Sequence, residues 1–312
     1  MLPSLRALVT AALALASIGC APMAAPATDS VAQDATDTTD ARDPSDARDV
    51  ERAMDVAPDR AVEDAALSPD AADSDSGRED SASPADAPAP LRVLFIGNSY
   101  TYVNDLPATL VAMTRGSRTD ALTVDSVTVG GATLQLHWQM TGAQTRLAAG
   151  GYGAVVLQGQ SVEPLFQPTV FGRFADEFGA LARRTSARPV WFATWARRAG
   201  DPLYTESFSG GSPDAMTRGL EREYAAAATR NGGTLAKVGE AWRRAIAERP
   251  ALALHSDDGS HPSVAGTYLA ACVFYAALFG HAVSETAEVP SGLGAEDARA
   301  LRAIAAAVHA ER

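Results

Sequence analysis

The sequence of residues 91–312 predicts a three-layer α/β/α sandwich with a mainly parallel five-stranded sheet, of the flavodoxin-like type. Short apolar runs alternate along these residues with longer stretches in which apolar residues recur at helical spacing. Such alternation implies parallel strands joined by right-handed crossovers, with helices on both faces of the sheet. About 220 residues are ample for the core of one domain. We expect Trp191 and Cys272 to be buried in that core.

The expected strands are short, apolar segments, at residues 92–96, 122–128, 154–157, 189–194 and 234–238. Helical spacing predicts helices at residues 106–115, 142–149, 169–184, 213–231, 238–248, 263–279 and 295–310. In sheets of this type, ligands bind at the carboxyl ends of the strands, where the loops gather. Polar residues that directly follow a strand are therefore the first candidates for a functional site.

Residues 1–20 have the pattern of an export signal. Arg6 precedes an apolar run, residues 7–18, that is too short to span a bilayer as a permanent helix. Small residues before Cys20 resemble the lipobox of bacterial lipoproteins, although Ser17 stands where leucine is usual. We expect lipidation at Cys20, which would anchor the protein in the bacterial cell envelope, at the outer membrane. The alternative is ordinary secretory cleavage nearby, which would release the protein.

Residues 21–90 have the composition of a disordered acidic tether. They consist mainly of Ala, Asp, Ser, Pro and Thr, and such a segment cannot bury enough apolar surface to offset its ordering entropy. The tether holds 18 acidic residues and 5 arginines, whereas residues 91–312 hold 20 acidic and 20 basic residues. The net charge of −12 therefore comes from the tether. The domain has no net charge to attract nucleic acid or acidic lipid, and we expect membrane contact only through Cys20.

A serine follows the first predicted strand. The apolar run breaks at Gly97-Asn98-Ser99, where Gly97 permits a tight turn and the following residues would begin a helix. Ser99 would then lie at the carboxyl edge of the sheet with helix amides near its hydroxyl. On this motif alone, a serine that caps the next helix is the simpler interpretation.

A second motif near the C-terminus favours a nucleophilic serine. In Asp258-Gly259-Ser260-His261-Pro262, the acid stands three residues before the histidine on a loop that enters a helix. Asp258 can contact one ring nitrogen of His261 while the other faces the sheet edge, as the acid does in a serine triad. Pro262 suits the first turn of the following helix. The alternatives are Asp257 as the acid, or a solvated Asp-rich turn with metal affinity or none.

The pairing of Gly97-Asn98-Ser99-Tyr100-Thr101 with the Asp258 to Pro262 motif resembles the SGNH (GDSL-type) hydrolase superfamily, in the branch with Gly-Asn-Ser in place of Gly-Asp-Ser. The resemblance covers essentially all of residues 91–312. It implies a serine ester hydrolase in which Ser99 is the nucleophile, His261 the general base and Asp258 the orienting acid. It implies neither a metal ion nor an organic cofactor.

The resemblance further implies three donors to the oxyanion: the amide of Ser99, a glycine amide after the second strand and an asparagine side chain after the third. Gly131 takes the second place, with Gly130 as the alternative if the turn is shifted by one. Gln160 stands in the place of the asparagine, and its extra methylene makes it a longer and less fixed donor. Loss of one such donor can cost about 3 kcal/mol. Either the loop is repositioned to suit glutamine, or catalysis is weak.

Side chains near the same loop ends are candidate substrate contacts, namely Asn98, Tyr100, Trp138, Gln158 and Trp195. Aromatic faces suit sugar rings or acyl chains, although large aromatics more often pack than bind. Arg197 and Arg198 could bind an anionic group, but a solvated loop is the simpler interpretation.

The resemblance to SGNH hydrolases and the predicted export signal together suggest a carbohydrate O-acetylesterase or related short-chain esterase at the cell surface. Its substrate would be an acetylated glycan. One alternative is a non-catalytic carbohydrate-binding domain on the same fold, which Gln160 suggests. The other is a lipase or thioesterase acting on acyl chains.

Overall fold

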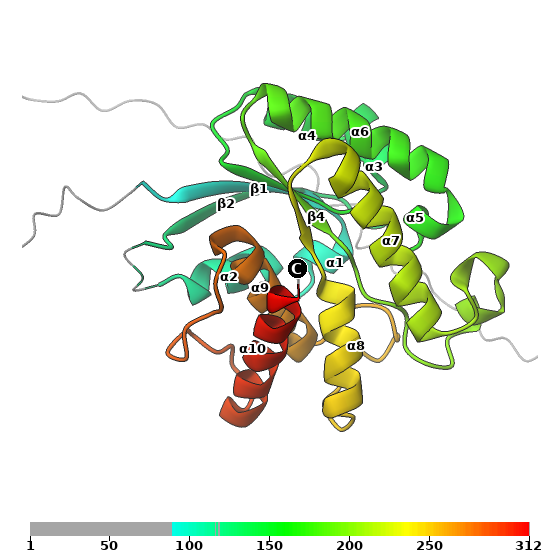
Figure 1. Ribbon diagram of the computed structural model, residues 1–312, viewed down its shortest axis with the longest axis vertical. Helices are drawn as coiled ribbons and strands as arrows, with labels where there is room; N and C mark the ends of the chain where they lie inside the picture. Colours follow the sequence, from blue (N-terminus) through cyan, green and yellow to red (C-terminus); the bar gives the residue numbers. More distant parts are fainter. Residues whose placement is uncertain (1–88, 116, 118, 312) are drawn as a thin grey trace, which may run out of the picture. The chain divides into compact units, whose positions relative to one another are not determined.

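The computed structural model describes residues 89–115, 117 and 119–311. The predicted export signal with Cys20, and all but the last two residues of the predicted tether, lie outside the described residues. Within the described residues the chain forms a parallel sheet with helices on both faces (Figure 1), which confirms the predicted fold class. None of the helices in this part of the chain has the length and apolar character needed to cross a bilayer.

All five predicted strands are present, in the spatial order β2-β1-β3-β4-β5. They are β1 (Leu91–Gly97), β2 (Leu122–Thr128), β3 (Ala154–Leu157), β4 (Arg188–Phe192) and β5 (Thr234–Ala236). β5 ends two residues earlier than predicted because Val238 already begins the next helix. In the centre of the sheet, Gly97 of β1 pairs with Thr128 of β2, and Ile96 pairs with Leu157 of β3. This register brings the loops that follow these three strands to one edge.

The seven predicted helices are present, and α7, α8 and α10 have the predicted bounds. They are α2 (Leu106–Met113), α4 (Ala143–Ala148), α6 (Pro168–Arg184), α7 (Pro213–Asn231), α8 (Val238–Glu248), α9 (Val264–Phe279) and α10 (Ala295–Ala310). Within the described residues, three short α-helices and two 3-10 turns were not predicted, because three to six residues are too few to show helical periodicity. They are α1 (Ser99–Tyr102), α3 (Leu134–Gln139), α5 (Glu163–Phe166), η3 (Pro202–Thr205) and η4 (Ser207–Ser209).

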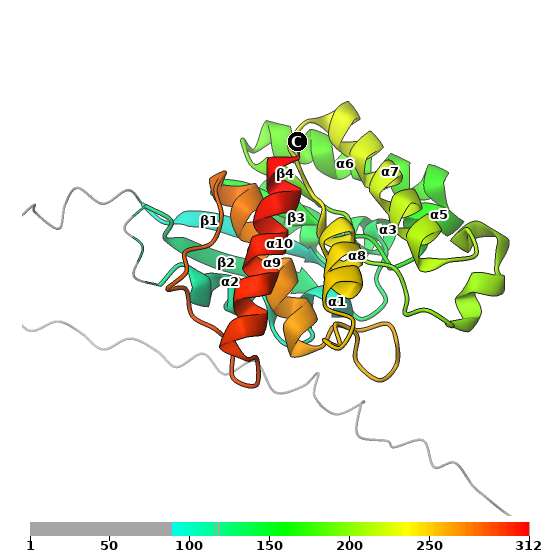
Figure 2. The ribbon, with the colours of Figure 1, turned by 60° about the horizontal axis from the view of Figure 1, so that its bottom comes forward.

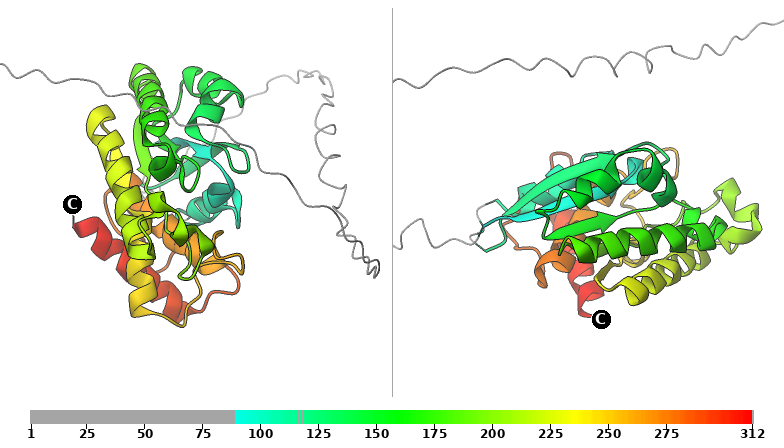
Figure 3. Two further views of the ribbon diagram at one scale, coloured as in Figure 1. Left: turned by 90° about the vertical axis from the view of Figure 1, so that its right-hand side faces the viewer. Right: turned by 90° about the horizontal axis from the view of Figure 1, so that it is seen from above.

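The helices form one layer on each face of the sheet. In Figure 1, α3, α4, α6 and α7 lie above the strands, and α2, α8, α9 and α10 lie below them. Successive side chains of a strand point to opposite faces, so β1 buries Val93 and Phe95 in the lower core and Leu94 and Ile96 in the upper core. Figure 3 shows the same layers from two other directions. Trp191 of β4 is fully buried in the upper core, as predicted.

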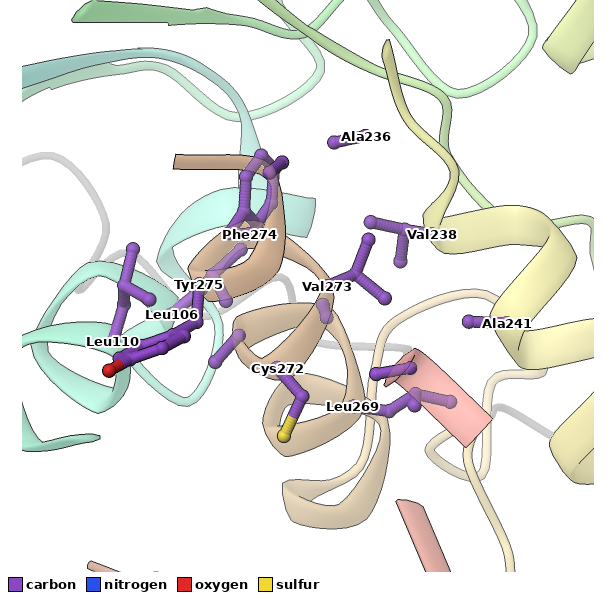
Figure 4. Packing of buried hydrophobic residues seen from close by; sticks show 14 of the residues in the cluster. Leu106, Leu110, Ala236, Val238, Ala241, Leu269, Cys272, Val273, Phe274 and Tyr275 are labelled. Atoms are coloured by element: carbon purple, nitrogen blue, oxygen red, sulfur yellow. The ribbon is translucent and has the colours of Figure 1, made fainter. Parts of the chain in front are cut away.

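α9 is the most enclosed helix of the lower layer. Every residue from Ala265 to Leu278 is buried, because α9 packs against the sheet, α2, α8 and α10 (Figure 2). In Figure 4, Tyr275 of α9 lies beside Leu106 and Leu110 of α2, and Val273 lies on the side of α8. Phe274 packs edge-on against Phe95 of β1 and Phe192 of β4. Cys272 is buried as predicted, and burial raises the pKa of its thiol to about 12.

Candidate active site

Ser99 is the first residue of α1, at the carboxyl end of β1. The residue that caps this helix is Asn98, whose side chain accepts a hydrogen bond from the amide of Tyr100 at 3.1 Å. The interpretation of Ser99 as the cap is therefore wrong. A Cβ atom at Gly97 would lie 2.5 Å from the side chains of both Gln158 and Thr101, so the turn into α1 requires glycine for close approach.

The side chains of Ser99, His261 and Asp258 form one chain of hydrogen bonds. Ser99 Oγ lies 2.8 Å from His261 Nε2, and His261 Nδ1 lies 2.5 Å from Asp258 Oδ2. Because a carboxylate only accepts hydrogen bonds, Nδ1 of the neutral ring carries the proton and Nε2 accepts from the serine hydroxyl. This tautomer leaves Nε2 able to take the serine proton.

Asp258 and not Asp257 contacts the histidine, as expected. Its second oxygen accepts hydrogen bonds from the amides of Ser260 and His261 at 2.8 and 2.9 Å. Burial opposes ionisation of Asp258, but the bonds from the His261 ring and from the two amides outweigh burial and lower the pKa to about 2. The carboxylate is therefore ionised throughout the neutral range.

The loop that carries His261 is held at several points. The amide of Ser256 donates to the carbonyl of His261 at 2.8 Å, and Asn104 Nδ2 donates to the carbonyl of Pro262 at 2.8 Å. The prediction that Pro262 opens the next helix was wrong by two residues: Ser263 caps α9, which begins at Val264. Pro262 instead fixes the backbone just before the cap, with its carbonyl facing Asn104.

Aromatic rings stack beneath this loop. Tyr100 stacks on Trp195 with ring centroids 4.4 Å apart, and Trp195 stacks on Trp242 at 4.1 Å. Trp195 is 1% exposed, and its Nε1 donates to the carbonyl of Ser260 at 2.9 Å. The prediction that Trp195 contacts substrate was therefore wrong, because packing and this bond occupy its ring. Tyr100 is nearly buried but lines the pocket described below, and burial raises the pKa of its hydroxyl.

Asn98 and Gln158 form a buried amide network. Gln158 is fully buried; its oxygen accepts from the Asn98 amide and the Thr101 hydroxyl, and its Nε2 donates to Asn98 Oδ1 and the Gly159 carbonyl. Asn98 Nδ2 donates to the carbonyls of Ala132 and Gly159 at 3.1 and 3.4 Å. Both were predicted to contact substrate. The prediction was wrong for Gln158, which is fully buried with its polar atoms paired and lies outside the pocket lining, whereas Asn98 lines the pocket described below. The network instead ties together the loops after β1, β2 and β3.

Trp138 also lies outside the pocket. It is half-buried on α3, and its ring packs edge-on against Phe178 of α6 with centroids 5.0 Å apart. The predicted substrate contact was wrong because the loop after β2 coils into α3, which turns Trp138 toward the upper core.

The two other residues expected as oxyanion donors lie at the pocket. Gly131 has φ +67°, which favours glycine, and a Cβ atom there would meet open space. Gln160 Oε1 accepts hydrogen bonds from the amides of Val162 and Glu163 at 2.8 and 3.2 Å, which fixes the side chain at the start of α5. Among the described residues, Nε2 of Gln160 has no hydrogen-bond partner. The two bonds to Oε1 hold the Gln160 side chain in place on the loop after β3.

Two buried ionisable side chains hold this edge of the sheet. His137 Nε2 donates to the carbonyl of Gly97 at 2.8 Å, and burial lowers the pKa of its ring. Glu163 Oε2 accepts from the amides of Leu134 and Gln160 at 3.2 and 3.0 Å, and burial raises the pKa of its carboxyl. Sequence reasoning missed the positions of both side chains, since neither belongs to a recognisable motif.

The triad and the expected oxyanion donors lie at one pocket of about 310 Å³. The pocket is lined by Asn98, Ser99, Tyr100, Gly131, Gln160, Ser161, Arg197, Asp258, Ser260 and His261. Arg197 is half-buried, and its guanidinium donates to Ser161 Oγ at 3.1 Å. The interpretation of Arg197 as a solvated loop residue was wrong. The signal that could have placed it is its position shortly after β4, at the edge where ligands bind.

Comparison with solved structures finds proteins similar to this chain in sequence and fold. A candidate SGNH hydrolase from Slackia heliotrinireducens is 32% identical in sequence; the match covers 61% of this chain and 100% of that one, with a TM-score of 0.53. A DUF4886 family protein from Bacteroides uniformis shares the fold at 18% identity, covering 70% of this chain and 95% of that one, with a TM-score of 0.56. No model of a known protein family matches the chain, and no curated protein does. With 32% identity over the whole length of the Slackia protein, the chain belongs to the SGNH hydrolases.

Proposed function

We propose that this SGNH hydrolase cleaves carboxylic esters through an acyl-enzyme, with Ser99 as the nucleophile. The observation that carries the proposal is the unbroken chain of hydrogen bonds from Ser99 through His261 to Asp258. Serine becomes a useful nucleophile when an adjacent base accepts its proton and a third group orients that base. The three side chains occupy these relative positions at the wall of one pocket.

In the proposed reaction, Ser99 Oγ attacks the ester carbonyl carbon while His261 Nε2 takes the hydroxyl proton. Asp258, ionised and bonded to Nδ1, stabilises the imidazolium that forms. The tetrahedral intermediate collapses when the carbon–oxygen bond to the alcohol breaks and His261 returns the proton to the leaving oxygen. Water then attacks the acyl-enzyme by the same route in reverse, releasing the acid and restoring Ser99.

We assign the oxyanion to the backbone amides of Ser99 and Gly131 and to Nε2 of Gln160. Among the described residues, neither backbone amide has a hydrogen-bond partner, and all three residues line the pocket. Fixing Gln160 Oε1 on two amides restricts the side chain, which offsets the looseness of its additional methylene. Preorganised donors of this kind supply much of the rate enhancement in acyl transfer.

The proposed substrate is a short-chain ester on a polar carrier, of the O-acetylated glycan class. Its support is the lining of the pocket, which consists mostly of polar side chains and glycine rather than the apolar walls that an acyl chain requires. We further propose that the enzyme acts outside the cell, anchored through a lipid at Cys20 and held away by the acidic segment of residues 21–90, or released if Cys20 is not lipidated.

The decisive experiment compares the wild type with Ser99→Ala and His261→Ala on para-nitrophenyl acetate. Each variant should lose hydrolysis while circular dichroism and melting temperature stay close to wild type. A phosphonate probe that reacts with activated serines should label the wild type at Ser99, located by peptide mass. If either variant keeps full activity, the assignment of the nucleophile or base is wrong; a silent probe combined with glycan binding would indicate a non-catalytic binding domain.

The chain-length preference is tested separately with para-nitrophenyl esters from acetyl to palmitoyl. We expect kcat/KM to be highest for acetyl and to fall as the chain lengthens. A maximum at long chains would contradict the proposed substrate class and indicate a lipase or thioesterase.

A further inference from the structure

We infer that Arg197 binds a carboxylate on the ester substrate and thereby selects acidic esters over neutral ones. The inference rests on the proposed function, because the carboxylate would belong to the molecule that Ser99 attacks. Arg197 lines the same pocket as Ser99 and His261, so a substrate bound there would have its acyl carbon and its charged group within one small cavity.

The backbone around Arg197 is held rigidly. The carbonyl of Ala196 accepts a hydrogen bond from His255 Nε2 at 2.9 Å, and the carbonyl of Arg197 accepts one from the Tyr204 hydroxyl. Trp195, two residues before Arg197, lies within the aromatic stack. A binding group must be positioned before the ligand arrives, and these contacts position the base of the Arg197 side chain.

The guanidinium of Arg197 forms few of the hydrogen bonds that it can donate. It can donate five hydrogen bonds, yet within the described residues it donates one, to Ser161 Oγ, and forms no ion pair. Its Nε is buried and has no hydrogen-bond partner in the part of the chain that the structure describes. A half-buried cation with few partners costs free energy in the unliganded protein, and an anion bonded to the guanidinium would lower that cost.

The charges around Arg197 favour a singly charged ligand. Asp258, the acidic residue in the pocket lining, is bonded to His261 and two backbone amides and, within the described residues, forms no ion pair with Arg197. A carboxylate carries one negative charge and matches the planar guanidinium with two parallel hydrogen bonds. A phosphate dianion would be repelled more strongly by Asp258, so the geometry points to a carboxylate, as on an O-acetylated acidic sugar.

The test compares esters that differ in one carboxylate. For the alcohol side, para-acetoxybenzoate is paired with neutral para-acetoxybenzamide; for the acyl side, the para-nitrophenyl monoester of succinate is paired with para-nitrophenyl butyrate. Each pair is measured with the wild type and with Arg197→Met, which keeps the length and apolar stem of the side chain. Arg218→Met is the matched control, because Arg218 is an exposed arginine of α7 outside the pocket lining.

We expect the wild type to prefer the acidic ester of at least one pair by about tenfold in kcat/KM, mainly through KM, with a preference that weakens as salt is added. Arg197→Met should abolish the preference, with a larger loss of kcat/KM for the acidic partner than for the neutral one, whereas Arg218→Met should keep the preference. Equal rates for acidic and neutral esters in both pairs, or an equal loss on both partners in Arg197→Met, would overturn the inference.

Binding separates this inference from the proposed reaction. Titration calorimetry of para-acetoxybenzoate and of the succinate monoester into Ser99→Ala should give, for at least one of them, a Kd about tenfold lower than that of Ser99→Ala/Arg197→Met. If neutral ester hydrolysis depends on Ser99 but Arg197 affects neither binding nor selectivity, the carboxylate site is contradicted and the proposed hydrolysis is not. Binding that depends on Arg197, in a protein that cleaves none of the esters, would contradict the proposed hydrolysis and leave the anion site standing.

Discussion

Asn104 Nδ2 donates a hydrogen bond to the carbonyl of Pro262, across 158 positions of the chain. Asn104 belongs to the turn that follows α1, the helix that begins with Ser99, and Pro262 directly follows His261. The same amide nitrogen also contacts the hydroxyl of Thr267 on α9 at 3.2 Å. One side chain therefore joins the segment that carries the proposed nucleophile to the segment that carries the proposed base.

Asn104→Asp should lower kcat for para-nitrophenyl acetate by about ten- to a hundredfold, because a carboxylate cannot donate to the Pro262 carbonyl and small displacements between reacting groups are costly. Asn and Asp both tolerate the positive φ of 56° at this position, so the backbone should be retained. Steady-state kinetics with a thermal melt checks the prediction. An unchanged kcat in a folded Asn104→Asp protein would show that this bond does not set the geometry of the site.

Gln160→Glu separates the two functions we assign to this side chain. Glutamate keeps an oxygen for the amides of Val162 and Glu163 but lacks the Nε2 donor. We expect kcat to fall about a hundredfold or more, the usual loss for one oxyanion donor. Gln160→Ala, which removes both functions, should lose the same activity and also some thermal stability. Wild-type turnover in Gln160→Glu would exclude Gln160 as a donor.

Asp258→Asn should lower kcat by about 10³- to 10⁴-fold, since an amide in this place allows the wrong tautomer of His261. The neighbouring Asp257→Asn is the matched control and should change kcat less than twofold, because the contact that Asp257 makes with Arg198 uses its backbone carbonyl. Since the pKa of Asp258 is about 2, loss of activity above pH 4 should not arise from protonation of this carboxylate. Comparable losses in both variants would contradict the assignment of the acid.

Stability should decline as the pH falls below about 6.5. Burial lowers the pKa values of His137 and His255 from 6.5, so both rings stay neutral in the folded protein while they take up protons in the unfolded chain. The two neutral histidines make their full contribution to the free energy of unfolding above pH 6.5. This contribution is lost as the pH drops through the folded pKa values, by up to about 1.4 kcal/mol per histidine and pH unit.

Denaturant unfolding at pH 7.5 and pH 5.5 measures this decline, with His137→Gln as the comparison. Glutamine can still donate to the Gly97 carbonyl but does not titrate, so the variant should lose less stability between the two pH values than the wild type. An identical pH dependence in both proteins would show that His137 does not contribute.

The layered fold and the meeting of Ser99, Asp258 and His261 could be predicted because both depend on order along the chain. Alternating strands and helices fix a parallel sheet, and a parallel sheet gathers residues such as Ser99 at one edge. The spacing of Asp258 and His261 is local, so a single turn sets their contact.

The predictions for Gln158 and Trp195 failed for a common reason. Each lies near the end of a strand, as predicted, but its polar atoms bond to other loops that only the folded chain brings near. Arg197 shows the converse: its sequence surroundings resemble a solvated loop, yet the aromatic stack and Tyr204 hold it against the pocket. Position along a strand can be inferred from sequence, whereas the direction of a side chain depends on long-range packing.

The enclosure of α9 has a consequence for how the enzyme would fail on heating. His261 lies two residues before the cap of a helix whose buried residues run from Ala265 to Leu278. The loop that carries His261 is thus continuous with the most enclosed helix of the lower layer. Displacing this loop would require the lower layer to unfold. Heat inactivation and cooperative unfolding should therefore have the same midpoint temperature. No folded but inactive protein should accumulate at temperatures below that midpoint.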